Sequence, residues 1–337
     1  MQMGIVSAGR RRMIISRTPL RITFVGGGTD LPEYYKKYGP GAVISAAVNK
    51  YVYINVNKRF DNSIRVGYTK TEIVDRPEDI QHPTVRESLR LLGIDGGIEI
   101  TTMADIPAGG TGMGSSSSFL VGLLNALHSW KGEYVGPTEL AEEAVEIERR
   151  ILKEPGGKQD QYMASFGGLQ FMEFEKDESV RITPIIMSEK SREHLHDSLL
   201  LVYTGIQRSS TSIHIRQTAQ VEMHLDAYKR MVDITRDMFN DLTKNNWEAS
   251  GGYLNENWNL KKTLSDNITD AGIDKYCNAA IASGAVGCKL IGAGGGGFML
   301  FFAPPEKHQA IMNSLSGLRP EPFEFAYAGS RIVYVGD

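Results

Sequence analysis

Cysteine is the scarcest chemically distinctive residue in this chain, whose 337 residues include only Cys277 and Cys288. Two cysteines exclude the disulfide framework that staples small secreted domains, and they exclude a metal cluster held by cysteine. Both lie in apolar stretches of the sequence. We therefore expect two buried free thiols in a protein of the reducing cytoplasm.

Long apolar runs and a strong charge imbalance are missing as well. No stretch approaches the ~20 apolar residues that a membrane span needs, and residues 1–16 lack the order of segments expected of a secretory signal. The formal net charge is −3, and the densest basic run, residues 10–12, is interpreted as a solvated tail. We therefore expect neither a membrane nor a nucleic acid as a partner.

The order of the expected elements indicates an α+β fold without regular alternation of strands and helices. Asp30 is expected to cap a helix that has Pro32 in its first turn. A seam near residues 185–197 divides the chain into two expected domains, 1–190 and 191–337. The other elements are expected from their periodicity: strands at 21–25, 42–48, 51–60, 63–68, 98–103, 286–291, 298–303, 323–328 and 330–335, a hairpin near 169–185, and helices at 82–94, 119–130, 138–153, 212–283 and 306–316.

Glycine and serine are concentrated in residues 107–118, PAGGTGMGSSSS, between an expected strand and a strongly apolar helix. Glycines let the backbone approach a ligand, and a helix that begins there points free N–H groups and its positive end at one spot. Phosphate suits that spot, and nearby hydroxyls can reach a divalent cation. The segment is not a Walker A loop, because Ser115 stands where lysine is required. A serine-rich helix cap after an ordinary turn is the alternative.

A second glycine cluster, IGAGGGGFML, places Gly292, Gly294 and Gly297 in the spacing of a dinucleotide fingerprint. That fingerprint must open a helix, whereas the residues that follow, FMLFFAPP, predict a strand that stops at two prolines. We interpret the cluster as a turn between two strands whose backbone approaches a ligand or another loop. A plain hairpin turn is the alternative, although it needs fewer glycines.

Three charged residues stand where a charge needs a partner. Glu148 falls in line with the apolar face of the helix at 138–153, so it requires a metal ion, a buried basic residue or other donors, and these alternatives stay open. Asp160 lies in a polar turn, where a plain surface aspartate is the alternative. Arg21 begins a core-facing strand, where an ion pair at the sheet edge is the alternative. Together with the anion loop, these are the parts of a phosphoryl-transfer site.

The three blocks TPLRITFVGGGTDL, PAGGTGMGSSSS and KLIGAGGGGFML resemble, in this order, the signatures of the GHMP kinases. The resemblance covers roughly residues 15–335. It implies an N-terminal domain like part of ribosomal protein S5, a ferredoxin-like C-terminal domain, and ATP and Mg²⁺ as cofactors. It also implies a small-molecule sugar phosphate as the second substrate, and a homodimer is left open.

The resemblance implies a role for particular residues of this chain. Asp160 is the expected general base, with Arg21 beside it and Lys158 as a weaker basic candidate, and Ser116 and Glu148 are the expected metal ligands. The residues expected to bind the nucleotide are Pro107, Ala108, Gly109, Gly110, Thr111, Gly112, Gly114, Ser115, Ser116 and Ser117. The residues expected to bind the substrate are Gly28, Thr29, Asp30, Asp160, Arg208, Gly294, Gly295 and Gly296, with Lys289 as a further candidate for the distal phosphate.

Departures from the family pattern bear on the substrate. The loop is one residue longer than the common form and has Met113 in place of leucine. Gly27 and Gly28 replace the Glu-His pair of galactokinases, which makes room for a bulkier sugar. The blocks are most similar to the branch that phosphorylates the anomeric hydroxyl of D-glycero-D-manno-heptose 7-phosphate in nucleotide-heptose biosynthesis. A fucokinase-like or other sugar-1-kinase, and a non-catalytic member that binds a sugar or nucleotide, are the alternatives.

Overall fold

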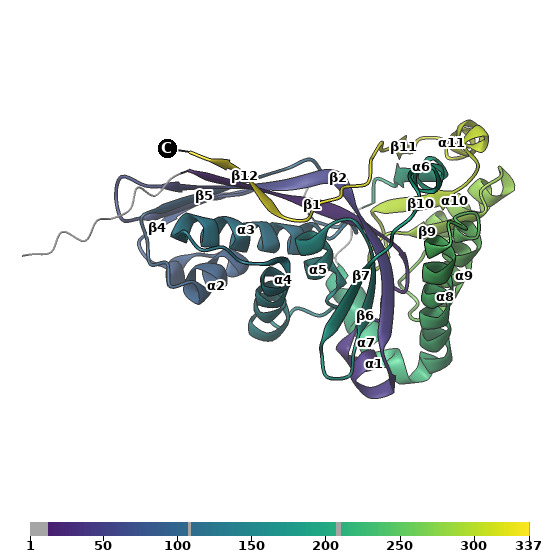
Figure 1. The fold of residues 1–337 in the computed structure, drawn as a ribbon, viewed down its shortest axis with the longest axis horizontal. Helices are drawn as coiled ribbons and strands as arrows, with labels where there is room; N and C mark the ends of the chain where they lie inside the picture. Colours follow the sequence, from purple (N-terminus) through teal and green to yellow (C-terminus); the bar gives the residue numbers. More distant parts are fainter. Residues whose placement is uncertain (1–12, 107–108, 207–209, 337) are drawn as a thin grey trace, which may run out of the picture.

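The computed structural model describes residues 13–106, 109–206 and 210–336, which form two sheets with helices packed against them (Figure 1). In the larger sheet, the strands β12-β1-β2-β5-β3-β4 lie in this order, and β6 pairs with both β2 and β7. Its strands are β1 (Ile14–Val25), β2 (Gly41–Lys58), β3 (Ile64–Gly67), β4 (Thr71–Val74), β5 (Ile98–Ala104), β6 (Leu169–Phe174), β7 (Val180–Pro184) and β12 (Arg331–Val335).

The long strands β1 and β2 form the backbone of this sheet, and β2 divides its pairing along its length. Residues 41–46 pair with β6, whereas residues 52–58 pair with β5. The sheet therefore splays into two wings, as Figure 1 shows for β5 and β6. β1 is longer than the expected strand at 21–25 and is almost fully buried over its second half, which places Arg21 inside the protein rather than at an edge.

The smaller sheet has the order β11-β8-β10-β9, and its strands all come from the second half of the chain. They are β8 (Leu199–Tyr203), β9 (Gly287–Leu290), β10 (Phe298–Phe302) and β11 (Arg319–Pro320). The helices α8 and α9 stand beside this sheet (Figure 1), and α9 packs against β9 and β1. The glycine cluster connects β9 to β10, which confirms the expected strand-turn-strand.

The helices are distributed over both sheets. They are α1 (Pro32–Tyr38), α2 (Pro83–Leu91), α3 (Ser115–Lys131), α4 (Pro137–Val145), α5 (Gln159–Phe166), α6 (Glu189–Asp197), α7 (Ser210–Gln220), α8 (Leu225–Thr243), α9 (Ser250–Thr263), α10 (Ala271–Ala282) and α11 (His308–Ser314). Three 3₁₀ turns, Pro77–Asp79, Val221–His224 and Pro305–Lys307, and one π-helical turn, Glu146–Ile151, complete the set. No helix within the described ranges is long and apolar enough to cross a membrane.

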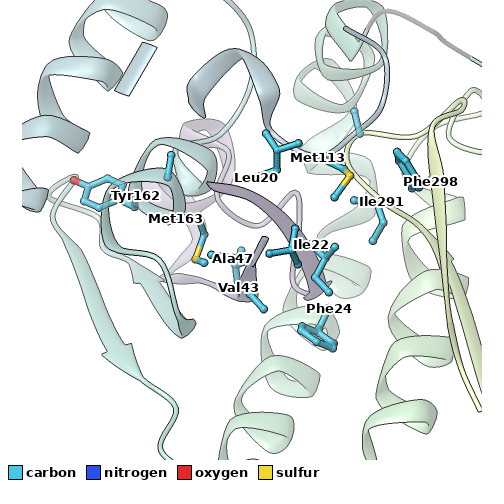
Figure 2. Close-up of a cluster of buried hydrophobic side chains, with 14 of the residues drawn as sticks. Leu20, Ile22, Phe24, Val43, Ala47, Met113, Tyr162, Met163, Ile291 and Phe298 are labelled. Atoms are coloured by element: carbon cyan, nitrogen blue, oxygen red, sulfur yellow. The ribbon is translucent and has the colours of Figure 1, made fainter. Parts of the chain in front are cut away.

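The apolar helix α3 packs on β1 and β2, and the core is continuous from this contact to the second glycine cluster. Figure 2 shows Met113 in one cluster with Leu20 of β1 and with Ile291 and Phe298 from the two ends of the glycine cluster. Met113 has no exposed surface. The two glycine-rich segments are therefore anchored in the same apolar core.

Three local expectations are wrong. Residues 323–328 form no strand and contribute one isolated bridge, between Phe325 and Val48. Asp30 does not cap α1, because the carboxylate accepts N–H groups of Gly28 and Gln159 instead. The periodicity of the helix expected at 138–153 places Ile151 on its buried face, but Ile151 is 41% exposed, because the π-helical turn changes the angular spacing of residues.

The domain division at residue 190 stays a prediction. The two sheets agree with a change of architecture near it, because β7 ends at Pro184 and β8 begins at Leu199. The last strand, β12, returns to the larger sheet and pairs antiparallel with β1. The chain therefore crosses between the two sheets a second time near its end.

The two cysteines correct the expectation of free thiols. Cys277 of α10 and Cys288 of β9 form a disulfide, with their Cα atoms 5.8 Å apart. This separation falls within the usual range of about 4.4–6.8 Å. The contact arises because α10 packs directly on β9, and a separation of 11 residues in sequence does not reveal that packing.

His128 links the end of α3 to α4 and predicts a pH dependence of stability. Its Nε2 lies 2.9 Å from Glu143, and its Nδ1 lies 2.9 Å from Glu133. The Glu143 and Glu133 carboxylates raise the pKa of His128 above its usual 6.5. The stabilisation is therefore fully present below pH 6.5 and is lost as the pH rises through the raised pKa. In urea unfolding, the free-energy difference between wild type and His128→Gln should be about 1 kcal/mol larger at low pH than at high pH. A difference that does not vary with pH would contradict this assignment.

Candidate active site

The loop before α3 presents free backbone N–H groups at the helix start. Gly114 adopts a left-handed conformation with φ 75°, and α3 begins at Ser115 without a side-chain cap. Gly112, with φ 77°, packs so closely that a Cβ there would lie 2.2 Å from the Ile291 carbonyl oxygen. The loop therefore rests against the second glycine cluster, and its uncapped helix start suits an anion.

The four serines of this loop have different environments. Ser116 donates to Glu148 Oε1 at 2.9 Å, Ser117 donates to Glu148 Oε2 at 2.8 Å, and Ser118 donates to the Pro19 carbonyl at 2.8 Å. The Ser115 hydroxyl is buried, finds no hydrogen-bond partner in the described part of the chain, and lines a cavity. Ser115 and Ser116 therefore face ligand space, whereas Ser117, expected to bind the nucleotide, supports Glu148 instead.

Glu148 is 2% exposed and is held by neutral donors rather than by a buried cation. Its Oε2 accepts from Ser117 and from the Gln161 amide, whereas its Oε1 accepts only from Ser116. Arg149 approaches no closer than 3.9 Å. The π-helical turn turns Glu148 toward the start of α3, and such turns occur often at functional sites. Oε1 and the Ser116 hydroxyl form a hard oxygen pair, which fits Mg²⁺.

This oxygen pair supplies two ligand atoms, fewer than a metal ion needs from all its ligands together. The described residues contain no group of three or more His, Cys, Asp or Glu side chains that could hold a metal ion. Mg²⁺ usually keeps several waters and takes one or two protein oxygens together with substrate phosphates. The residues present therefore fit a Mg²⁺ ion that arrives with a nucleotide.

Asp160 and Arg21 form a two-pronged ion pair. Arg21 Nε lies 2.7 Å from Asp160 Oδ1, and Nη2 lies 2.8 Å from Oδ2. Arg21 also donates from Nη1 to the Gly112 carbonyl. A Cβ on Gly114 would lie 3.3 Å from the Asp160 carboxyl carbon, so the pair lies directly against the loop. The structure thus brings Asp160, Arg21 and the loop together.

Two cavities meet at this pair. The larger has a volume of about 550 Å³ and is bordered by the loop, the start of α3 and the second glycine cluster. The smaller has a volume of about 40 Å³ and is bordered by Gly28, Asp30, Gln159 and residues of α7 and α9. Both are lined by Arg21 and Asp160. A base at this junction can reach one ligand on each side.

Part of the lining of the larger cavity is aromatic. Tyr68 and His82 meet edge to face with ring centroids 4.9 Å apart, and His82 lies 5.3 Å from Phe119. Burial lowers the pKa of His82, so its ring is neutral near pH 7. This surface suits a flat heteroaromatic ring. None of these three residues is predicted as a site residue from the sequence, although Phe119 is the fifth residue of α3.

The expected substrate residues are only partly brought together. Gly28 and Asp30 line the smaller cavity, whereas the Thr29 hydroxyl is engaged with Ala42 in the core. Gly294 and Gly296 line the larger cavity, and Gly295 lines neither cavity. The second glycine cluster therefore borders both cavities rather than the substrate side alone.

Two expected basic residues point elsewhere. Lys158 donates to the Glu178 carbonyl at 2.8 Å and lies over the Tyr35 ring, so it does not accompany Asp160. Lys289 donates to the Thr23 and Phe24 carbonyls and is 1% exposed. Both lysines satisfy backbone carbonyls within the protein, and neither lines a cavity at this site.

The remaining expected residues lie partly in the lining of the larger cavity and partly outside the described residues. Gly109, Gly110, Gly112 and Gly114 line the larger cavity, whereas Thr111 is buried between the two glycine-rich segments and does not. Pro107, Ala108 and Arg208 lie outside the described residues.

Sequence reasoning missed the basic and amide groups of the smaller cavity: Arg149, His214, Gln217 and Lys261. One signal was available for Lys261. It continues the buried stripe of α9 that includes Leu254 and Trp258, and a lysine on such a stripe needs an explanation.

Comparisons with known proteins agree with this geometry. The N-terminal domain model of the GHMP kinases matches residues 82–168, and the C-terminal model matches residues 238–317. A D-glycero-alpha-D-manno-heptose 7-phosphate kinase from Campylobacter jejuni is 31% identical over 90% of this chain and 93% of its own length. An L-fucokinase/L-fucose-1-P guanylyltransferase from Bacteroides fragilis is 25% identical over 92% of this chain but only 37% of its own length.

A solved structure gives the same result for the fold. The crystal structure of a D-glycero-D-manno-heptose 1-phosphate kinase from Bacteroides thetaiotaomicron superposes with a TM-score of 0.80, at 25% identity. The match covers 96% of this chain and the whole of that one. The anion loop, the buried carboxylate and the aspartate–arginine pair thus occur on a known kinase fold. This chain belongs to the GHMP kinase family.

Proposed function

We propose that this protein is an ATP-dependent sugar kinase that phosphorylates the anomeric hydroxyl of D-glycero-D-manno-heptose 7-phosphate and yields the 1,7-bisphosphate. The observation that carries the proposal is the Asp160–Arg21 pair, which lines both cavities at their junction. The substrate follows the similarity to the heptose phosphate kinases, which extends over nearly the whole chain.

The larger cavity suits ATP. The nucleotide phosphates would lie along Gly109–Gly114 and on the free N–H groups at the start of α3, where the helix dipole favours negative charge. The base would lie against Tyr68, His82 and Phe119. Ser116 and Glu148 would hold Mg²⁺, which when bound neutralises charge on the β- and γ-phosphates.

Asp160 would accept the proton of the sugar hydroxyl as its oxygen attacks the γ-phosphorus. The new bond forms between that oxygen and phosphorus, the bond from phosphorus to the bridging oxygen of the β-phosphate breaks, and ADP leaves. Arg21 holds both oxygens of Asp160 in place and offsets the charge of the transferring group. The two cavities would hold donor and acceptor in line, and this positioning lowers the barrier further.

A coupled assay of ADP release tests the proposal. We expect efficient turnover with heptose 7-phosphate and weak turnover with L-fucose, mannose and unphosphorylated heptose. Phosphorus NMR of the product should show a glycosidic phosphate at C1. Preference for L-fucose would overturn the substrate, and the absence of ADP release with every sugar would overturn the kinase.

The aromatic lining of the larger cavity leads to a separate prediction. Phe119→Ala removes a ring from the surface proposed to stack on the base, and such contacts contribute about 0.5–1.5 kcal/mol beyond buried area. KM for ATP should therefore rise about tenfold, whereas KM for the sugar stays within about twofold. Steady-state kinetics with each substrate varied in turn measures both. Tyr134→Ala, at an exposed ring, is the matched control, and an equal rise in both KM values would contradict the assignment.

A further inference from the structure

The smaller cavity contains positive charge that the proposed chemistry does not use. Lys261 of α9 is 4% exposed, and its Nζ donates to the Gly292 carbonyl at 2.7 Å. Among the described residues, no carboxylate lies within ion-pair distance of this ammonium. An ammonium carries three N–H donors, so Lys261 retains donors and a charge that no close partner satisfies.

The surroundings of Lys261 compensate its positive charge only weakly. Burial lowers its pKa to about 8, and the more distant Asp30 and Asp160 carboxylates offset only part of this effect. The group is thus mainly protonated at neutral pH, although it lies in a buried site. A buried ammonium without a close counter-ion is costly, and an anionic ligand would remove that cost.

Arg149 brings a second cation to the same cavity from the π-helical turn. Its Nε donates to the Gly157 carbonyl at 2.9 Å, and Nη1 reaches the Glu154 carbonyl at 3.3 Å. The guanidinium also lies 3.3 Å from the position of a Cβ on Gly156, so its plane is held against the loop. Arg149 is therefore positioned in advance of any ligand.

Two further polar groups in this cavity find no partner among the described residues. They are the Nε2 of Gln217, whose side chain belongs to a residue that is 1% exposed, and the buried Nδ1 of His214. Burial and the charge of Lys261 lower the pKa of His214 to about 4, so its ring is neutral. A buried donor without a partner is costly, and an acceptor-rich ligand would satisfy the Gln217 amide.

The only carboxylate that lines this cavity besides Asp160 is Asp30, within the described residues. Its oxygens accept the Gly28 and Gln159 N–H groups at 3.0 and 3.2 Å. It can accept further hydrogen bonds but repels an anion. Sugar hydroxyls therefore suit the Asp30 side, and an anionic group suits the side of Lys261, Arg149 and Gln217.

We propose that Lys261, together with Arg149 and Gln217, binds the phosphate that the sugar already carries and so determines the choice of a phosphorylated acceptor. This inference rests on the proposed function, because it specifies how that acceptor is recognised. A volume of about 40 Å³ is about three times the ~10–15 Å³ that one water requires, so the space suits a compact oxyanion. The sugar would extend from there toward Asp160.

Lys261→Met tests the proposal, with Lys262→Met as the matched control. Lys262 is the next residue of α9, and it pairs with Asp274 at 3.6 Å instead of lining the cavity. For Lys261→Met we expect KM for heptose 7-phosphate to rise at least tenfold, because a charge-assisted contact is lost. The kcat should stay within about threefold, and KM for unphosphorylated heptose should not change. Lys262→Met should resemble wild type with both acceptors.

Several results would overturn the inference. A fall in kcat without a change in KM would assign Lys261 to the transferring phosphoryl group. A loss of the same size with both acceptors, or in both variants, would exclude recognition of the acceptor phosphate. If Lys261→Met does not fold, Gln217→Glu replaces it, because a carboxylate in the cavity should raise KM for the phosphorylated acceptor alone.

Failure of the proposed function gives a different result. In that case wild type does not turn over heptose 7-phosphate at all, and the site is then tested by calorimetric titration of inorganic phosphate. Weaker phosphate binding by Lys261→Met than by wild type and Lys262→Met would support an anion site. Equal binding by all three proteins would overturn it.

Discussion

Asp160→Asn should lower kcat by about 1000-fold and leave nucleotide binding nearly unchanged. General base catalysis contributes roughly 10²–10⁴-fold, and an asparagine amide cannot accept the proton of the attacking hydroxyl. The amide oxygen can still accept one of the two hydrogen bonds that Arg21 donates to Asp160. The arginine is therefore not left without a partner in a buried site, and the fold should be retained.

The measurement for Asp160→Asn combines turnover with calorimetric binding of a non-hydrolysable ATP analogue. The dissociation constant for the analogue should stay within about threefold of the wild-type value, since Asp160 lies at the junction of the cavities rather than among the residues proposed to hold the nucleotide. Asp177→Asn, in an exposed turn, controls for the loss of a carboxylate. A variant at position 160 with turnover within tenfold of wild type would remove the assignment of the base.

Glu148→Gln should lower kcat/KM by roughly 100- to 1000-fold, because metal-assisted stabilisation of transferring charge contributes several kcal/mol. The substitution removes the negative charge beside Ser116 while preserving the volume of the side chain. It also places an amide where Oε2 now accepts from Ser117 and Gln161, so part of the hydrogen bonding is lost. Thermal unfolding of the variant separates this structural cost from the loss of the metal.

Nucleotide binding supplies a readout for Glu148 that does not depend on turnover. In wild type, Mg²⁺ should tighten binding of the ATP analogue, and this effect should disappear in Glu148→Gln. Glu146→Gln is the matched control, because Glu146 lies in the same π-helical turn but pairs with Arg150 at the surface. An equal effect of Mg²⁺ on the variant and on wild type would count against ligation by Glu148.

Two helical segments each carry a charged residue on a buried face, Glu148 and Lys261. Helical periodicity predicts the burial of Glu148, and the structure confirms it. Its partners came from α3 and α5, and no spacing within its own helix could reveal them. Lys261 occupies an equivalent position on α9, where the buried stripe is visible in the sequence, but its neighbours come from other parts of the chain.

Local chemistry was enough to predict most elements of this protein. Strand alternation, apolar helical stripes and glycine clusters each depend on residues close in sequence, so the strands around both glycine-rich segments and the helices α2 and α3 were expected. The expectation failed at residues 323–328, whose pattern is that of a strand. They make one bridge with Val48, because a strand also requires a neighbouring edge that is free to pair.

By itself, the sequence predicted a glycine-rich loop suited to an anion, a buried carboxylate and an aspartate near a basic residue, and it showed the resemblance to the GHMP kinases. Tertiary structure alone decided which of these groups meet. It paired Arg21 with Asp160, 139 positions apart in the sequence. It also placed Lys158 and Lys289 so that they donate to backbone carbonyls, and it brought Cys277 together with Cys288. The reason is that a charge takes its partners from all elements packed around it, and that packing depends on the whole chain.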